Sequence, residues 1–167
     1  MCSEKRFKDK TLLMGTGLVY SLRVIRIIRI SAGKKFFLCR DINGMKHLIP
    51  VSFYYDYKIS AGDSINCRLD KINCQGRFYF EPEHPFYKTN KVYSFRLSGF
   101  NKVKSSDDLN IYKAIVIDVY GHAWHTLRFQ MKSFPPRKLS SLQCNVISIK
   151  KARLILEVAD RRVTCRL

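Results

Sequence analysis

The first half of the chain interleaves basic and aromatic side chains in three short stretches. Flat aromatic rings can stack on nucleic-acid bases, at roughly 1 to 3 kcal/mol per base, and ammonium and guanidinium groups can bind phosphates. These residue types predict contacts with a single-stranded nucleic acid if the fold places them on neighbouring strands or their rims. The candidate side chains are Lys34, Lys35, Phe36, Lys46, His47 and Arg77.

The chain of 167 residues carries a large positive charge. Its 31 lysines and arginines outnumber its 13 aspartates and glutamates, so the formal net charge is +18 at pH 7. Such an excess opposes compaction by self-repulsion and favours a polyanion or an acidic surface as the usual partner. A basic surface that merely promotes solubility is the alternative interpretation.

The six cysteines are scattered and form no Cys-x-x-Cys pair. This spacing is poor for a zinc site and unlike a compact disulfide framework. We therefore expect a reducing, cytoplasmic compartment and no metal site. No apolar run approaches the roughly 20 residues that span a bilayer, so we expect no membrane partner.

Candidate catalytic groups do not converge in the sequence. His122 and His125 alone do not make a metal-ligand spacing, and Glu81 and Glu83 would need further polar groups from elsewhere to form an acid–base pair. The chain has no glycine-rich phosphate loop and no nucleophile elbow. We expect no catalytic residues, no cofactor and no enzymatic activity.

Alternating apolar residues and turn signals place the candidate side chains on short strands. The first strand is rich in β-branched residues, but its three evenly spaced arginines, Arg23, Arg26 and Arg29, do not share one face of a regular strand. Either one arginine lies at a barrel rim, or a bulge near Ile25 to Ile27 shifts the register by one. Asn43-Gly44 marks a hairpin turn, whereas Pro82 and Pro85 stop the last strand because proline has no N–H for a sheet. The expected strands are 18–30, 34–40, 45–51, 64–72 and 77–81.

Periodicity leaves three assignments open. Residues 53–60 form either a short helix or an ordered loop. At least one of Phe36 and Phe37 faces the core because side chains alternate along a strand. His47 is either part of a binding surface or an exposed histidine without a role.

The second half of the chain repeats the first. Val92-Tyr93-Ser94-Phe95-Arg96 follows Val19-Tyr20-Ser21-Leu22-Arg23 by 73 positions, and Cys144 follows Cys67 by 77. The expected strands of this half are 92–103, 111–120, 124–131, 142–149 and 153–158.

A strand order with a hairpin at two to three and a longer connection at three to four is that of an OB-fold, a five-stranded Greek-key barrel. We therefore predict an all-β chain of two tandem small five-stranded OB-fold-like barrels. The expected organisation is a basic leader at 1–16, a first barrel at 17–87 and a second barrel at 88–167.

The first half resembles the S-one RNA-binding domain, an OB-fold module repeated in a large bacterial ribosomal protein. The matching segments are Gly33-Lys34-Lys35-Phe36-Phe37, Gly44-Met45-Lys46-His47-Leu48, Gly62-Asp63 and Asn73-Cys74-Gln75-Gly76-Arg77-Phe78-Tyr79-Phe80. The resemblance implies an RNA-facing cluster of Phe36, His47, Asn73 and Arg77, with Asn73 at a position that is acidic in the family. His125 is expected to answer to His47 in the second barrel, which we expect to keep the fold without the binding role.

Two hypotheses follow for function. The first is a cytoplasmic protein that binds single-stranded RNA, or single-stranded DNA, by stacking and phosphate contacts on the first barrel. The second is a basic protein-interaction or regulatory module that docks an acidic protein or a ribonucleoprotein without base contacts.

Overall fold

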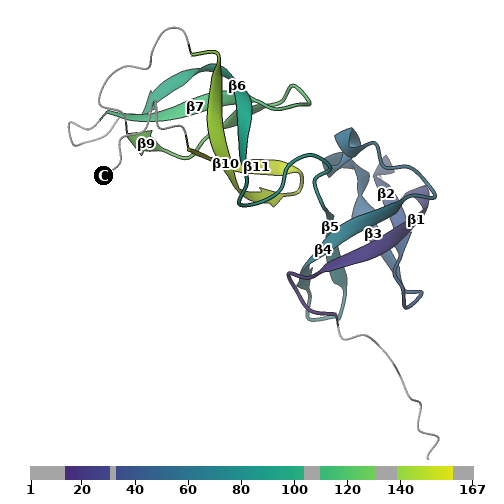
Figure 1. Ribbon diagram of the computed structural model, residues 1–167. Helices are drawn as coiled ribbons and strands as arrows, with labels where there is room; N and C mark the ends of the chain where they lie inside the picture. Colours follow the sequence, from purple (N-terminus) through teal and green to yellow (C-terminus); the bar gives the residue numbers. More distant parts are fainter. Residues whose placement is uncertain (1–13, 31–32, 104–109, 131–138, 160–167) are drawn as a thin grey trace, which may run out of the picture. The chain divides into compact units, whose positions relative to one another are not determined.

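A computed structural model describes residues 14–30, 33–103, 110–130 and 139–159, and the regular secondary structure of these residues is mostly β-strand (Figure 1). The chain divides into two compact units, of which unit 1 ends at Glu83 and unit 2 begins at His84. Each unit forms its own sheet. The predicted all-β fold of two tandem barrel-like units is therefore confirmed. Within the described ranges, no helix has both the length and the apolar character needed to cross a membrane.

Unit 1 is a five-stranded antiparallel sheet with the order β3-β2-β1-β4-β5. The meander from β1 to β3, followed by the return of β4 to the other side of β1, is a Greek key. Contacts between β3 and β5 bring the two edges of the sheet together. Its strands are β1 (Val19–Arg29), β2 (Lys35–Arg40), β3 (Lys46–Pro50), β4 (Ser64–Ile72) and β5 (Phe78–Pro82).

The segment between β3 and β4 contains two short 3-10 turns, η2 (Val51–Phe53) and η3 (Tyr55–Tyr57). Tyr54, between them, is buried. Burial raises the pKa of its phenol, with a smaller contribution from the carboxylate of Glu81. The segment thus combines the two forms considered for residues 53–60, since the short helix η3 lies within an otherwise irregular, ordered connection.

Unit 2 repeats the same order as β11-β10-β6-β7-β8, with the short β9 also paired to β7. The predicted strand at 124–131 is divided, because the chain leaves β8 at His125 and rejoins β7 at Phe129. The strands are β6 (Val92–Val103), β7 (Ile111–Ile117), β8 (Ala123–His125), β9 (Phe129–Gln130), β10 (Ser141–Lys150) and β11 (Arg153–Val158).

Both units bend their first strand at the same place. The pairing of β1 with β2 shifts register between Val24 and Arg26, which confirms the predicted bulge, and the pairing of β6 with β7 shifts between Leu97 and Gly99. An extra residue increases the local twist and lets one strand serve both sides of a small barrel.

The two units also share their strand register. Tyr20 lies opposite Cys67 in unit 1, and Tyr93 lies opposite Cys144 in unit 2. The same β-scaffold is therefore built twice, so the paired strand positions of unit 1 have structural equivalents in unit 2. These equivalents provide an internal control for side chains that lie on the strands.

Candidate nucleic-acid interface

The side chains of β2 and β3 separate into an inner and an outer set. Phe37, Cys39 and Ile49 are buried inside unit 1, whereas the intervening residues point outward. Leu38 lies opposite both Arg26 and Leu48, and Arg40 lies opposite Lys46. Directly opposite residues share one face of a sheet. This answers which of the two phenylalanines faces the core. Phe37 lies in the core, and Phe36, which is partly buried, lies on the outside.

The outward residues of β5 extend this surface. Tyr79 is 39% exposed and lies opposite Lys71, whose Nζ is 4.9 Å from the centre of the Tyr79 ring. Because β3 contacts β5, Tyr79 continues the surface beyond β3. We call this surface the outer face of unit 1. It consists of Arg26, Phe36, Leu38, Arg40, Lys46, Leu48, Lys71 and Tyr79.

The outer face combines apolar contact area with positive charge. Four of its eight residues are lysine or arginine, all four are exposed, and none of the eight is acidic. Leu48 is 44% exposed, so part of its apolar side chain is accessible among the basic groups. Such a surface can hold a base against an apolar side chain or aromatic ring while cations bind the neighbouring phosphates.

Five of the seven predicted residues lie on the outer face or beside it. Phe36 and Lys46 belong to it. Lys34 and Lys35 are exposed at the start of β2, and Arg77 is exposed immediately before β5. These three positions add positive charge at the rims of the same surface.

The structure does not place His47 on this surface. Its side chain points into unit 1 and is 5% exposed, because it lies opposite the buried Cys39. The imidazole Nε2 is 2.8 Å from Asp41 Oδ2, and its ring packs edge-on against Phe78 and Phe80, with centroids 5.8 and 4.7 Å away. In this position His47 offers no open ring face to a base, so the RNA-facing role implied by the resemblance is replaced by a role in the core.

Asn73 also has a structural task. Its side-chain oxygen accepts hydrogen bonds from the backbone N–H groups of Gln75 and Arg77, at 3.1 and 2.8 Å. These bonds close the turn between β4 and β5, as asparagine commonly does in tight turns. Asn73 therefore positions Arg77 and keeps its own oxygen occupied.

Six residues of the outer face were not among the predicted site residues, namely Arg26, Leu38, Arg40, Leu48, Lys71 and Tyr79. Alternation from Phe36 would have found Leu38 and Arg40, because every second residue of a strand shares a face. Tyr79 carries no such local signal. Its place on the surface depends on the contact of β5 with β3, which lies far away in the sequence.

Unit 2 does not have the four basic residues of this surface at the equivalent positions. By the shared register, the equivalents of Arg26, Arg40, Lys46 and Lys71 are Gly99, Ile117, Ala123 and Ser148. Tyr79 is likewise replaced by Ile155 and Phe36 by Lys113. The four basic side chains and both rings are thus features of unit 1 and are not required by the scaffold.

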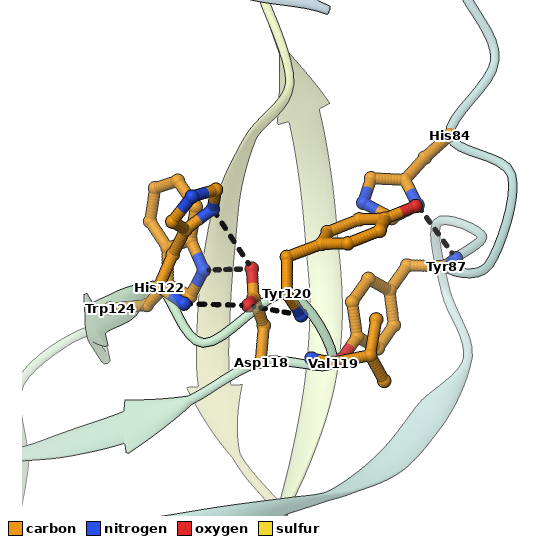
Figure 2. Close-up of polar contacts among 7 residues, drawn as sticks. All are labelled: His84, Tyr87, Asp118, Val119, Tyr120, His122 and Trp124. Atoms are coloured by element: carbon orange, nitrogen blue, oxygen red, sulfur yellow. Dashed lines mark hydrogen bonds and ion pairs between the residues drawn. The ribbon is translucent and has the colours of Figure 1, made fainter. Parts of the chain in front are cut away.

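Unit 2 instead contains a polar cluster around the turn between β7 and β8 (Figure 2). Oδ1 of Asp118 accepts hydrogen bonds from the backbone N–H groups of Tyr120 and His122, at 2.8 and 2.9 Å. Oδ2 accepts one from Nε1 of Trp124 at 2.7 Å and lies 3.6 Å from Nδ1 of His122. Asp118 is therefore saturated with donors and fixes the turn.

The Asp118 turn is equivalent to the Asp41 turn of unit 1. There, Oδ1 of Asp41 accepts hydrogen bonds from the N–H groups of Asn43 and Met45, at 2.9 Å each. Trp124 occupies the position of His47, since it lies opposite Val116 as His47 lies opposite Cys39. The expectation that His125 answers to His47 is wrong, because His125 is the equivalent of Leu48 and is exposed on the other face.

A buried histidine supports the start of unit 2 (Figure 2). Nδ1 of His84 accepts hydrogen bonds from the N–H groups of Phe86 and Tyr87, at 3.1 and 3.0 Å. Burial lowers the pKa of His84 to about 4, and the nearby charge of Asp118 opposes this shift without cancelling it. The Tyr87 ring stacks on Phe95 and its hydroxyl accepts a hydrogen bond from the N–H of Val119 at 3.1 Å. The segment that follows Glu83 is thus part of the unit 2 core.

The described residues of the two units offer no evident place for a metal ion. No group of three or more His, Cys, Asp or Glu side chains within the described part of the chain could hold one.

Comparison of the chain with protein-family models, with curated proteins and with solved structures finds no match. The functional argument therefore depends on the geometry of the outer face.

Proposed function

We propose that unit 1 binds single-stranded nucleic acid, with RNA as the expected ligand, through its outer face and without catalysis. Phe36 and Tyr79 would stack on bases while Arg26, Arg40, Lys46 and Lys71 contact phosphates. The strand order of both units supports an OB-fold-like description, and in OB-folds the second and third strands commonly face oligonucleotides. The buried free thiols of Cys39, Cys67 and Cys144 support a reducing, cytoplasmic compartment.

The observation that carries this proposal is the difference between the two units. The same scaffold carries four basic residues, the exposed ring of Tyr79 and the partly buried ring of Phe36 at these positions in unit 1. In unit 2 the basic residues are replaced by glycine, isoleucine, alanine and serine, and the two rings by isoleucine and lysine. Exposed lysines and arginines occur on both units, but the rings Phe36 and Tyr79 occur together with four cations at these positions only in unit 1. This combination supports a ligand that needs cations and flat contact surfaces together.

A basic protein-interaction module is the second candidate. The aliphatic strip formed by Leu38 and Leu48 favours it, because aliphatic side chains contact an acidic protein surface as readily as they contact bases. Binding to an acidic protein would require the basic residues of the outer face but would not depend on the two rings. The rings therefore discriminate between the two functions.

The test is fluorescence anisotropy with labelled oligo-U and oligo-dT at 50 and 200 mM salt. Phe36→Ala with Tyr79→Ala removes both rings, and Lys113→Ala with Ile155→Ala makes the equivalent changes in unit 2 as a matched control. With about five phosphate contacts at a slope near −0.7 each, wild-type affinity should fall roughly 100-fold over this salt range. Loss of two stacked rings should weaken binding at least about tenfold, whereas the control should bind like wild type.

Circular dichroism must first show that both variants are folded. Equal binding by wild type and the ring variant would exclude stacking and favour charge alone. Absence of binding to either strand would exclude the nucleic-acid function and make acidic proteins the partners to pursue. Tighter binding of oligo-U than of oligo-dT would support RNA as the ligand.

A further inference from the structure

The two barrel-like units join the two edge strands of their sheets in different ways. These edge strands are β3 and β5 in unit 1, and β8 and β11 in unit 2. In unit 2, the residues that follow β8 join β11 through the backbone. Thr126 forms a parallel bridge with Leu156, and the N–H of Leu127 donates to the Leu156 carbonyl at 2.7 Å. In the described part of unit 1, no strand pair joins β3 to β5, although the two strands are in contact.

A proline explains why unit 1 lacks this bond. Ile49 lies opposite Phe37 in unit 1, and Thr126 bonds to Ala114, the equivalent of Phe37, in unit 2. Ile49 and Thr126 are therefore equivalent, and so are the residues that follow them, Pro50 and Leu127. Phe80, opposite Leu69, is the equivalent of Leu156, opposite Val146. Proline has no N–H to donate, and the bond made by Leu127 therefore cannot form at Pro50.

In unit 1, side chains connect the edge strands β3 and β5. His47 projects from β3 and packs its ring against Phe78 and Phe80 of β5. Asp41 fixes the orientation of that ring by accepting its Nε2–H, and the backbone N–H groups of Asn43 and Met45 in turn fix Asp41. An ionised carboxylate can only accept, so Nε2 is the donor.

We propose that His47 is a positioning residue that clasps β3 to β5 and thereby aligns the two parts of the outer face. Lys46 and Leu48 flank His47 on β3, and Tyr79 lies between its two ring contacts on β5. Any change in the spacing of β3 and β5 moves Tyr79 relative to Lys46 and Leu48. This inference rests on the proposed function of the outer face, although the clasp itself can be measured without a ligand.

The clasp is tested by hydrogen–deuterium exchange of the full chain in the absence of nucleic acid. His47→Ala removes the ring contacts and the bond to Asp41, and His47→Gln offers an amide donor without the ring. Backbone amides of β3 and β5 should exchange about tenfold faster or more in both variants, because the lost contacts lower the cost of local opening. The strands of unit 2 should be unaffected and serve as the internal control.

Substitution of Pro50 provides a rescue that does not involve His47. Pro50 has φ −63° and ψ 125°, an extended conformation that leucine adopts without strain. Pro50→Leu supplies the N–H that Leu127 provides in unit 2, so the double variant His47→Gln with Pro50→Leu should regain protection. Leu127→Pro is the converse change, and it should speed exchange in β8 and β11 alone.

Binding of oligo-U then separates the clasp from the function. The proposal is supported if the His47 variants, still folded by circular dichroism, bind about fivefold or more weakly and the Pro50→Leu rescue restores binding together with protection. Unchanged protection in the His47 variants would overturn the clasp. Lost protection with unchanged affinity would overturn the positioning role, and a wild type that binds no strand would refute the proposed function while exchange still decides the clasp.

Discussion

His47 and Trp124 occupy the same position in the two units, and each donates a ring N–H to the aspartate six residues before it. The donor–acceptor distances are 2.8 Å for His47 and Asp41, and 2.7 Å for Trp124 and Asp118. Two chemically different rings thus perform one structural task. The shared requirement is a buried N–H donor that can hold the aspartate of the hairpin turn, because a buried carboxylate without partners is costly.

The first prediction concerns this donor in unit 2. Trp124→Phe keeps an aromatic ring but removes the N–H, so the free energy of unfolding should fall by about 2 kcal/mol, the value expected for a hydrogen bond to a charged acceptor. Trp124→His, which introduces the residue found in unit 1, should lose less because it restores a donor. Urea denaturation followed by circular dichroism measures both. Equal losses in the two variants would show that ring size, and not the donor, is what matters.

The second prediction concerns pH and His84. Burial holds the pKa of His84 at about 4, below its ordinary value of 6.5, so the unfolded chain binds this proton at a higher pH than the folded chain does. Between about pH 6.5 and 4 the unfolded state therefore takes up more protons, and stability falls as the pH falls, by up to about 3 kcal/mol. Fluorescence of Trp124, the single tryptophan, follows urea unfolding of unit 2 across this range.

His84→Gln is the control for this pH dependence. Glutamine does not titrate, so the variant should be less stable than wild type at pH 7 but should lose less stability on acidification. The difference between the two pH profiles isolates His84 from the carboxylates that also titrate in this range. Parallel profiles would mean that the buried imidazole is not the group responsible.

Local patterns predicted the strands well, for an identifiable reason. The bounds expected for β4 (Ser64–Ile72), β6 (Val92–Val103) and β11 (Arg153–Val158) match those observed. Each of these segments combines β-branched or aromatic residues with clear turn signals, and both signals are encoded within a few residues. The bulge after Val24 was likewise predictable, because evenly spaced arginines do not fit an unbroken two-residue period.

The site was less predictable because it depends on contacts between distant strands. His47 points inward because its partner across the hairpin, Cys39, is buried and because the rings of β5 surround it. Neither fact can be derived from the residues next to His47. The role of Asn73 could have been predicted locally, since an asparagine three residues before a glycine is itself a turn signal. The resemblance to a binding motif led instead to its assignment to the RNA-facing cluster.

The third prediction tests the charge of the outer face. Arg40→Ile, Lys46→Ala and Lys71→Ser together introduce the unit 2 residues at three positions of unit 1. If all three contact phosphates, the slope of log affinity against log salt should decrease in magnitude by about 2, and binding at low salt should weaken strongly. Anisotropy over a salt series measures the slope for oligo-U.

A charge-matched variant controls for the loss of net charge. Lys91, Lys102 and Arg128 are exposed residues of unit 2, and their replacement by alanine removes the same three charges. This control should change the salt dependence little, because only cations that neutralise phosphates of the ligand release counterions and contribute to the slope. Equal changes in both triple variants would indicate that total charge, and not the outer face, attracts the ligand.

The fourth prediction concerns the thiols. Cys39 and Cys67 are buried in unit 1, and burial raises the pKa of Cys39 to about 12 and raises that of Cys67 as well. Because the thiolate is the reactive form, a pKa of about 12 instead of 9 lowers the reactive fraction near pH 8 by roughly 1,000-fold, in addition to steric protection. Cys74 is exposed in the turn between β4 and β5 and should react rapidly with a thiol reagent.

The thiol prediction is measured in a chain carrying Cys2→Ser and Cys165→Ser, since these two cysteines lie outside the described residues. Native protein should then show one fast thiol, which Cys74→Ser abolishes, and urea should expose the three buried ones. The raised pKa values also mean that the folded state holds these protons above pH 9 whereas the unfolded state releases them. Stability should therefore fall as the pH rises above about 9. A second fast thiol in the native protein would show that the unit containing it opens more readily than its buried core implies.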